Sequence, residues 1–226
     1  MAEDEIEKGW SLQESYCSIN FSRTKWHHDN VLHRFVPTMH WGIAFGSDLL
    51  TNRILGMTDQ SIVKMGNKQL STPSLLVDDF HSLEIPTLIE DMRDTMKAKK
   101  GVGIAAPQIG CNKRIIMFGF EKNERYPNEQ PVPFTILINP SYKVLSEENI
   151  ESWEGCLSIP GLRGLVPRAY KITYSGYDLQ GNKITRTAEG FHARVVQHEC
   201  DHLDGILFPQ RIKDMRNFGF EDTLNF

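Results

Sequence analysis

The stretch that decides the fold is FHARVVQHECDHL, residues 191–203. Its pattern predicts a helix, which Gly205 then ends. Within it His198 and His202 are four positions apart, so both imidazoles lie on one helix face and can reach a single cation. Glu199 lies beside them, where a carboxylate can handle a proton of a water molecule rather than bind the metal. We therefore predict a metal site on this helix.

A catalytic site of this kind normally has three protein ligands. The candidate for the third is Cys156, which follows Gly155, a residue that lets the backbone come close. A buried free thiol is the alternative for Cys156. Cys200 points off the face that carries the histidines, so it is more consistent with the core than with a ligand.

The remaining cysteines and histidines are weaker candidates. Cys17 and Cys111 have no neighbours typical of a metal site. A cluster of histidines near the N-terminus lacks helical spacing and an acidic partner, so we expect it on a solvated loop. Its members are His27, His28, His33 and His40.

The chain upstream of this helix predicts a second helix and several strands. Apolar residues recur at helical spacing over about 84–99, with Gly101 as the stop. Short buried strands are predicted at 114–118 and 134–138, the second ended by Asn139-Pro140. Runs 171–178 and 183–189 predict a hairpin joined through 179–182. Strands grouped between two helices favour an α+β fold over a parallel βαβ sheet.

Composition excludes several classes of protein. The chain has 226 residues, 40% of them hydrophobic, with a formal net charge of −4. It has no basic field to bind DNA and no apolar run long enough to span a membrane. The acidic start is unlike a signal or transit peptide, and four scattered cysteines favour reduced thiols. These features predict a cytoplasmic protein.

Three motifs, in order along the chain, together resemble the peptide deformylase family. They are GVGIAAPQ at 101–108, EGCLS at 154–158 and QHECDHLDG at 197–205. The resemblance runs from about Ser61 to Lys213. It implies an α+β fold in which antiparallel sheets pack around a central helix that carries the HExxH motif.

The resemblance also implies an activity, a cofactor and residue roles. The activity is hydrolysis of the formyl group from the N-formylmethionine of newly synthesised polypeptides, with release of formate during translation. The metal ligands are Cys156, His198 and His202, and one divalent ion is expected, natively Fe²⁺, with Zn²⁺, Ni²⁺ or Co²⁺ able to occupy the site. Glu199 moves the proton, and the side-chain amide of Gln108 and the backbone N–H of Leu157 stabilise the oxyanion.

Several further residues are expected to contact the substrate. The set is Val102, Gly103, Ile104, Val195 and Arg163, with Phe191 at the rim of the methionine pocket. Plain core is the alternative for each apolar residue, and a surface position is the alternative for Arg163. Arg168, with Asp201 or Glu154, is expected to hold the imidazoles in the right tautomer.

Residues 1–56 show no helical or strand period and match nothing in the family. We expect them to form an irregular, dispensable extension, or to lie upstream of a true start at Met57. Residues 57–226 are then the catalytic domain. The expected enzyme is a monomer that works transiently near the ribosome. The short tail after Lys213 indicates that the long C-terminal helix of some relatives is absent.

Two other functions remain open from the residues alone. A zinc peptidase shares the two-histidine helix, but usually draws its third ligand from downstream rather than from an upstream cysteine. A related fold without catalysis is the other alternative, and the presence of Gln108, Cys156 and Glu199 argues against it.

Overall fold

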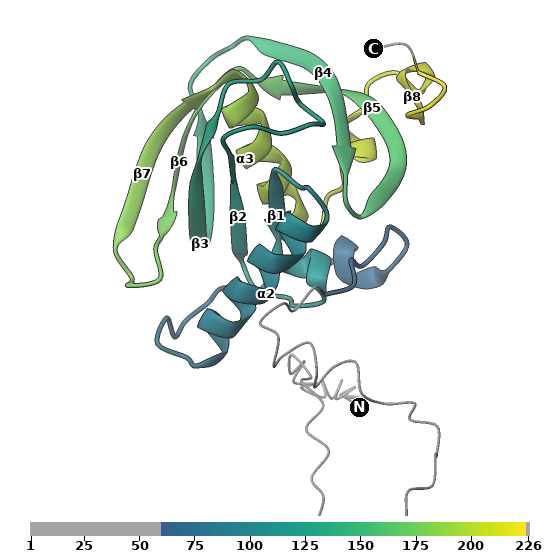
Figure 1. Ribbon diagram of the computed structural model, residues 1–226. Helices are drawn as coiled ribbons and strands as arrows, with labels where there is room; N and C mark the ends of the chain where they lie inside the picture. The colour runs from purple at the N-terminus through teal and green to yellow at the C-terminus, as the bar shows by residue number, and fades with distance from the viewer. Residues whose placement is uncertain (1–59, 225–226) are drawn as a thin grey trace, which may run out of the picture. The chain divides into compact units, whose positions relative to one another are not determined.

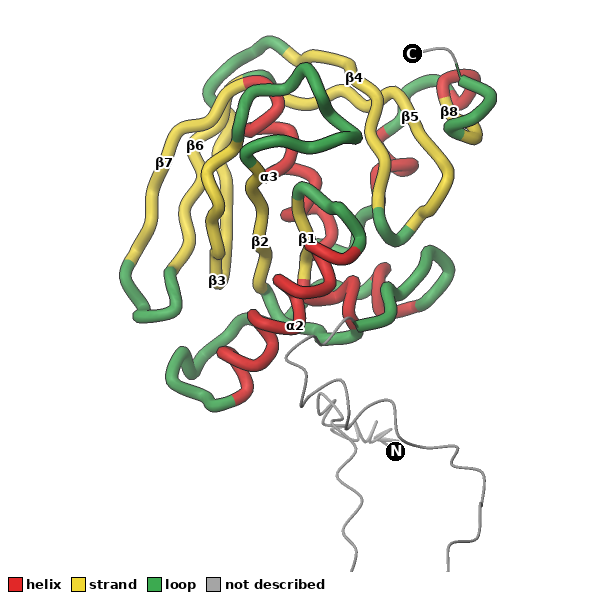
Figure 2. The backbone as a smooth tube through the Cα atoms, viewed as in Figure 1, coloured by secondary structure: helices red, strands yellow, loops and turns green. Residues whose placement is uncertain are grey.

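The computed structural model describes residues 60–224, which form an α+β fold with two antiparallel sheets (Figures 1 and 2). The five-stranded sheet has the order β1-β2-β3-β6-β7. Its strands are β1 Gly103–Ala105, β2 Ile115–Phe120, β3 Val132–Val144, β6 Lys171–Tyr177 and β7 Lys183–Glu189. The three-stranded sheet consists of β4 Asn149–Cys156, β5 Ile159–Ala169 and β8 Phe218–Phe220. The predicted fold class is confirmed.

Two α-helices and four short 3₁₀ turns complete the described part of the chain. The helices are α2 Glu84–Ala98 and α3 Gly190–Leu203, close to the predicted ranges. The 3₁₀ turns are η1 Lys68–Ser71, η2 Ala106–Ile109, η3 Phe208–Arg211 and η4 Met215–Asn217. Neither α-helix has the length and apolar character needed to cross a membrane.

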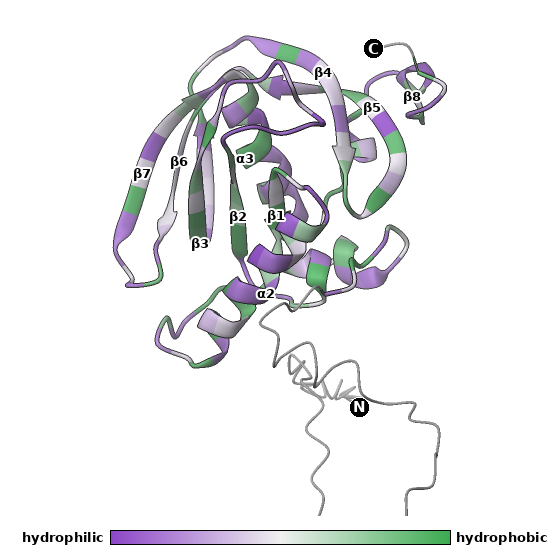
Figure 3. Cartoon of the chain, in the orientation of Figure 1, coloured by the Kyte–Doolittle hydropathy of each residue, from purple (hydrophilic) through white to green (hydrophobic). Residues whose placement is uncertain are grey.

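Strand β2 is buried on both faces and shows how the core is built. Ile116 and Phe118 pack in one apolar cluster with residues of α3, while Ile115 and Met117 pack in another with residues of α2. Alternate side chains of a strand point to opposite faces, so both faces of β2 are apolar (Figure 3). The two helices therefore cover opposite faces of the sheet at β2.

Helix α3 contacts strands of both sheets, and Figure 1 shows it between β2 and the β4–β5 pair. Val196, Cys200 and Leu203 are buried in the cluster shared with the five-stranded sheet. His198 and His202 leave the helix toward Cys156 at the end of β4. One face of α3 therefore fixes the helix in the core and another presents the metal motif.

The predicted end of a strand at Asn139-Pro140 is wrong. β3 continues to Val144 through a register shift between Ile138 and Ser141. Asn139 adopts a φ of 51°, and its side-chain amide bonds both backbone groups of Val77, at 2.9 Å each. Asn139-Pro140 therefore forms a bulge within the strand, and the Asn139 side chain binds the segment around Val77. The same dipeptide is typical of turns, so the sequence pattern does not separate the two structures.

Strands β4 and β5 were missed by sequence reasoning. Residues 155–167 contain Gly155, Gly161, Gly164 and two prolines, which are signals of turns and breaks. Long-range antiparallel pairing overrides those signals, with Asn149 opposite Ala169 and Glu154 opposite Gly164. The expectations for residues 1–56, including Cys17 and the histidine cluster, lie outside the described residues.

Candidate metal centre and active site

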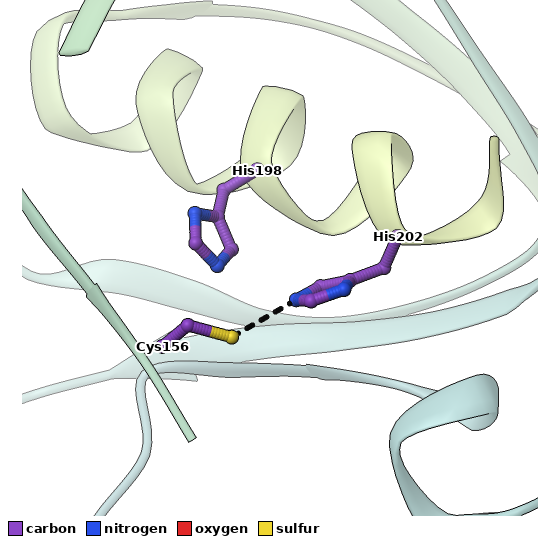
Figure 4. Close-up of side chains that lie close together, drawn as sticks. All are labelled: Cys156, His198 and His202. Carbon is purple, nitrogen blue, oxygen red and sulfur yellow. Dashed lines mark hydrogen bonds between the residues drawn. The ribbon is translucent and has the colours of Figure 1, made fainter. Parts of the chain in front are cut away.

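Three side chains from two elements converge on one point (Figure 4). Cys156 ends β4, and His198 and His202 lie one turn apart on α3. Their candidate ligand atoms all lie within 4.8 Å of one another, and Cys156 Sγ is 3.2 Å from His202 Nε2. Nδ1 of His198 is 2.9 Å from Glu154 Oε2, which leaves Nε2 for the site. The predicted ligand set is thus brought together.

The donor atoms of the three residues suit a cation. Burial alone would keep the Cys156 thiol neutral, but the adjacent His202 and His198 hold the pKa of Cys156 well below its usual value. Burial lowers the pKa of His198, but Cys156 and Glu154 overcome this and raise it well above the ordinary range, so metal binding would displace a proton from this site. One thiolate and two imidazoles are a donor set for first-row divalent metals, so the residues fit the expected ion.

Gln108 is fixed beside the sulfur atom. Its Oε1 accepts a hydrogen bond from the backbone N–H of Ala105 at 2.8 Å. Its Nε2 therefore faces Cys156 Sγ at 3.4 Å and Ser158 Oγ at 3.2 Å. The side chain is only 2% exposed, so its amide is held as a donor at the metal centre.

Glu199 points a buried carboxyl into the same cavity. It is 4% exposed, and its Oε2 has no hydrogen-bond partner among the described residues. Burial raises the pKa of Glu199 to about 7. A side chain at Gly103 would overlap the Glu199 carboxylate, so glycine is needed there. A carboxyl with a pKa near neutrality is suited to accept a proton and return it.

A buried ionic network holds His198 in place. Glu154 accepts two hydrogen bonds from Arg168, at 2.9 and 3.0 Å, and one from Arg194 at 2.8 Å. Although burial opposes it, the charge of Arg168 keeps the pKa of Glu154 well below its usual range. Arg168 also pairs with Asp201. Glu154 therefore stays ionised and accepts the Nδ1 proton of His198, as a partner that sets the tautomer should.

We expect Arg168→Met to lower the free energy of unfolding by about 3–5 kcal/mol, because it leaves two buried carboxylates short of a partner. Urea denaturation at matched metal content measures the change. Arg211→Met is the control, since Arg211 pairs with the same Asp201 but its side chain is 41% exposed. The control is expected to cost about 1 kcal/mol or less. Equal losses in the two variants would contradict this account of the network.

The pH dependence of this effect follows from Glu154. Because folding lowers its pKa, Glu154 contributes stability above the unfolded pKa of about 4.3, and this is lost as pH falls through the folded pKa. The gap between wild type and Arg168→Met should therefore be largest at neutral pH and shrink in acid.

A cavity of about 500 Å³, part of it open to solvent, leads to the metal ligands. Five residues predicted to act at the site line it besides the catalytic and ligand side chains: Val102, Gly103, Leu157, Phe191 and Val195. They come from β1 and the residue before it, from the turn after β4, and from α3. The cavity is therefore walled by both sheets and the motif helix.

Two predicted substrate contacts are not found at the cavity. Ile104 is fully buried in the cluster with α2, because neighbours on β1 alternate faces and Gly103 takes the cavity side. Arg163 is 4% exposed, bonds Glu221 at 2.7 Å and donates to the Tyr126 hydroxyl at 3.3 Å. Arg163 is not among the residues that line the cavity, and its contact with the peptide stays a prediction.

Four lining residues were not foreseen from the sequence: Arg125, Tyr126, Trp153 and Arg194. Arg125 and Tyr126 lie in the connection between β2 and β3, which has no motif or period that points to a site. Of the four, only Arg194 could have been predicted at the site, because it lies one helical turn before His198. The positions of Arg125, Tyr126 and Trp153 at the cavity depend on tertiary packing.

A thiolate, two imidazoles and a buried glutamate beside one cavity define a metal-dependent hydrolase site. The comparisons identify which one. The sequence profile of the polypeptide deformylase family matches residues 59–218, and the chain belongs to this family. It is an enzyme that removes the formyl group from the N-formylmethionine of nascent polypeptides.

Two curated relatives match this chain over more than nine tenths of their own length. The chain is 55% identical over 163 residues to peptide deformylase 1 of Nitrosomonas europaea, covering 72% of this chain and 93% of the relative. It is 54% identical over 163 residues to peptide deformylase 2 of Ralstonia nicotianae, covering 72% and 92%.

Solved structures agree with the fold. The Met-Ala-Ser-bound class I type b peptide deformylase of Acinetobacter baumannii matches with a TM-score of 0.65 and 38% identity, over 68% of this chain and 98% of that one. The peptide deformylase of Synechococcus elongatus, in complex with actinonin, matches with a TM-score of 0.63 and 32% identity, over 71% and 82%.

Proposed function

We propose that Cys156, His198 and His202 hold one Fe²⁺ ion, and that Zn²⁺, Ni²⁺ or Co²⁺ can replace it. The observation that carries this proposal is the convergence of the three ligand atoms within 4.8 Å beside a buried Glu199. When bound, a divalent cation supplies Lewis acidity, which lowers the pKa of water and polarises a carbonyl oxygen.

The protein's own residues then act on the formyl group. Glu199 takes the proton of the attacking water and returns it to the departing amine, as general base and then general acid. The Gln108 amide and the backbone N–H of Leu157 donate to the carbonyl oxygen as it becomes anionic. Because Gln108 is held by Ala105, it needs no reorganisation when that charge develops.

The methionine side chain enters the apolar part of the cavity. Val102, Phe191 and Val195 supply apolar surface, and Gly103 leaves room for Glu199 and for the peptide backbone. The Acinetobacter baumannii structure is described as bound to Met-Ala-Ser, which supports formyl-Met-Ala-Ser as a substrate here. We further propose that the enzyme is a cytoplasmic monomer that meets N-formylmethionyl chains close to the ribosome.

The direct test of this function is formate release. Protein purified without oxygen should release formate from formyl-Met-Ala-Ser and bind one metal per chain. The same protein should leave internal bonds of an unformylated peptide intact. Cleavage of the internal bonds without formate release would favour a zinc peptidase instead.

Iron as the native metal predicts loss of activity in air. A thiolate beside a redox-active ion is readily oxidised, so the iron enzyme should lose most of its activity under air while it stays active under argon. Exchange for nickel should give a longer-lived enzyme with the same substrate preference. Equal lifetimes of the iron enzyme in air and under argon would contradict iron as the native metal.

The catalytic domain is proposed to be residues 57–226. The family match begins at residue 59, and 163 residues of this chain are enough to match 93% of the Nitrosomonas europaea relative. Deletion of residues 1–56 should leave a protein that binds one metal and releases formate within about two-fold of the full chain. Loss of folding in the deletion would show that these residues belong to the domain.

A further inference from the structure

The connection between β2 and β3 places at the cavity one arginine, Arg125, whose guanidinium donates no hydrogen bond within the described residues. Arg125 lines the cavity and is half-buried. Within residues 60–224 its guanidinium makes no hydrogen bond or close ion pair; it lies 5.9 Å from the centroid of the Tyr126 ring, and its charge helps Arg163 to lower the pKa of Glu221. Both other arginines near the cavity are committed: Arg163 to Glu221 and Arg194 to Glu154.

Arg125 is held in this position by its surroundings. Asn123 accepts from the Arg125 backbone N–H at 2.9 Å and donates to the Lys100 carbonyl at 3.2 Å. Tyr126 packs against Phe191 of α3, with ring centroids 4.8 Å apart, and its hydroxyl accepts from Arg163. The segment is therefore fastened to the end of α2, to α3 and to β5, and its side chains are pre-positioned for a ligand.

The position of Arg125 along the cavity indicates what it binds. A Cβ placed on Gly155 would lie 3.2 Å from Arg125 Nη2. The guanidinium of Arg125 is therefore in contact with Gly155, the residue next to Cys156. The formyl group must lie at the metal ligands, so the rest of the peptide runs outward past this point. A guanidinium has five donors and no acceptor, so its natural partner there is an oxygen of the peptide.

We propose that Arg125 binds an acceptor oxygen of the nascent peptide beyond the formylmethionine and so determines which chain starts are processed fastest. The oxygen is a backbone carbonyl or a side-chain carboxylate, which share this chemistry. Arg163, the arginine that the motif assigns to the peptide, supports this segment by donating to the Tyr126 hydroxyl.

The test compares peptides of different length and charge as C-terminal amides, with the full-length metal-loaded enzyme. The quantity measured is the ratio of kcat/KM for formyl-Met-Ala-Ser amide to that for formyl-Met amide. Arg125→Gln should lower this ratio by about ten-fold, the effect of losing one hydrogen bond to a charged group. The ratio for Arg125→Lys should lie between those of the wild type and Arg125→Gln. Lys122→Gln, which removes a charge from the same connection away from the cavity, should leave the ratio unchanged.

Formyl-Met-Ala-Glu and formyl-Met-Ala-Gln amides distinguish the two oxygens. A wild-type preference for Glu that vanishes in Arg125→Gln identifies a carboxylate, and an equal loss on both peptides identifies a backbone carbonyl. The proposal is overturned if Arg125→Gln leaves both the length ratio and the preference for Glu over Gln unchanged. An equal fall in Lys122→Gln also overturns it, because it would reflect the general charge of the surface. Failure of the established activity would show separately, as no formate from formyl-Met amide in wild type.

Discussion

Replacement of Cys156 by alanine is expected to remove the metal and, with it, essentially all formate release. Cys156 supplies one of only three protein ligands, and its thiolate provides the only negative charge among them. Changing a residue that merely orients a ligand already costs about 10–100-fold in metal affinity, so losing the ligand itself should cost more. Metal content after gel filtration and formate release from formyl-Met-Ala-Ser measure the two effects.

Cys200 offers a matched control for this experiment. It lies between the two histidines in the sequence, but its side chain is buried in the core cluster and burial raises the pKa of its thiol far above the usual value. Cys200→Ala should therefore keep metal and activity, with only the modest loss of stability expected of a small cavity. A Cys156→Ala protein that retained one tightly bound metal would remove the cysteine from the ligand set.

The parts of the site that depend on local spacing were predictable from the sequence. His198 and His202 are brought together by the helix alone, because residues four apart share a face. The partner of Arg168 could only be narrowed to Glu154 or Asp201, and the structure pairs it with both. That outcome needs three-dimensional placement, since β4, β5 and α3 must meet before a single guanidinium can bridge two carboxylates.

The parts that depend on distant contacts were not predictable. Arg163 donates a hydrogen bond to Tyr126, 37 residues away in sequence, and to Glu221, 58 residues away, and neither contact can be inferred from local spacing. Ile104 is a different case, because the alternation of faces on a strand would have placed it in the core if β1 had been recognised. A position within a motif alone does not say which way a side chain points.

The same buried network that stabilises the fold also prepares the site for chemistry. Arg168 and Arg194 keep Glu154 ionised, and Glu154 holds His198 with Nε2 toward the other ligands. The pKa of Glu199 shifts in the opposite direction from that of Glu154. Neither arginine pairs with Glu199, so burial raises its pKa. Two glutamates at one metal centre thus have opposite properties: one a fixed anion and one a group able to exchange a proton.

Replacement of Glu199 by glutamine is therefore expected to separate catalysis from metal binding. Glutamine has the same shape and fills the space that Gly103 leaves, but its amide cannot take a proton from water. Turnover of formyl-Met-Ala-Ser should fall by about 10²–10⁴-fold, the usual contribution of a general base. The metal should stay at one per chain, since Cys156, His198 and His202 are unchanged.

The matched control is Glu189→Gln, just before the same helix. Glu189 is exposed and pairs with Lys171 at 2.7 Å, so its loss should change turnover by less than about two-fold and leave the metal in place. Near-normal turnover in Glu199→Gln would show that the proton is carried by another group. Loss of the metal together with activity would instead indicate that Glu199 binds the metal. Its Oε2, which is buried and has no hydrogen-bond partner in the described structure, would then be the ligand atom. Persistence of metal with loss of turnover is the one result that assigns Glu199 to proton transfer alone.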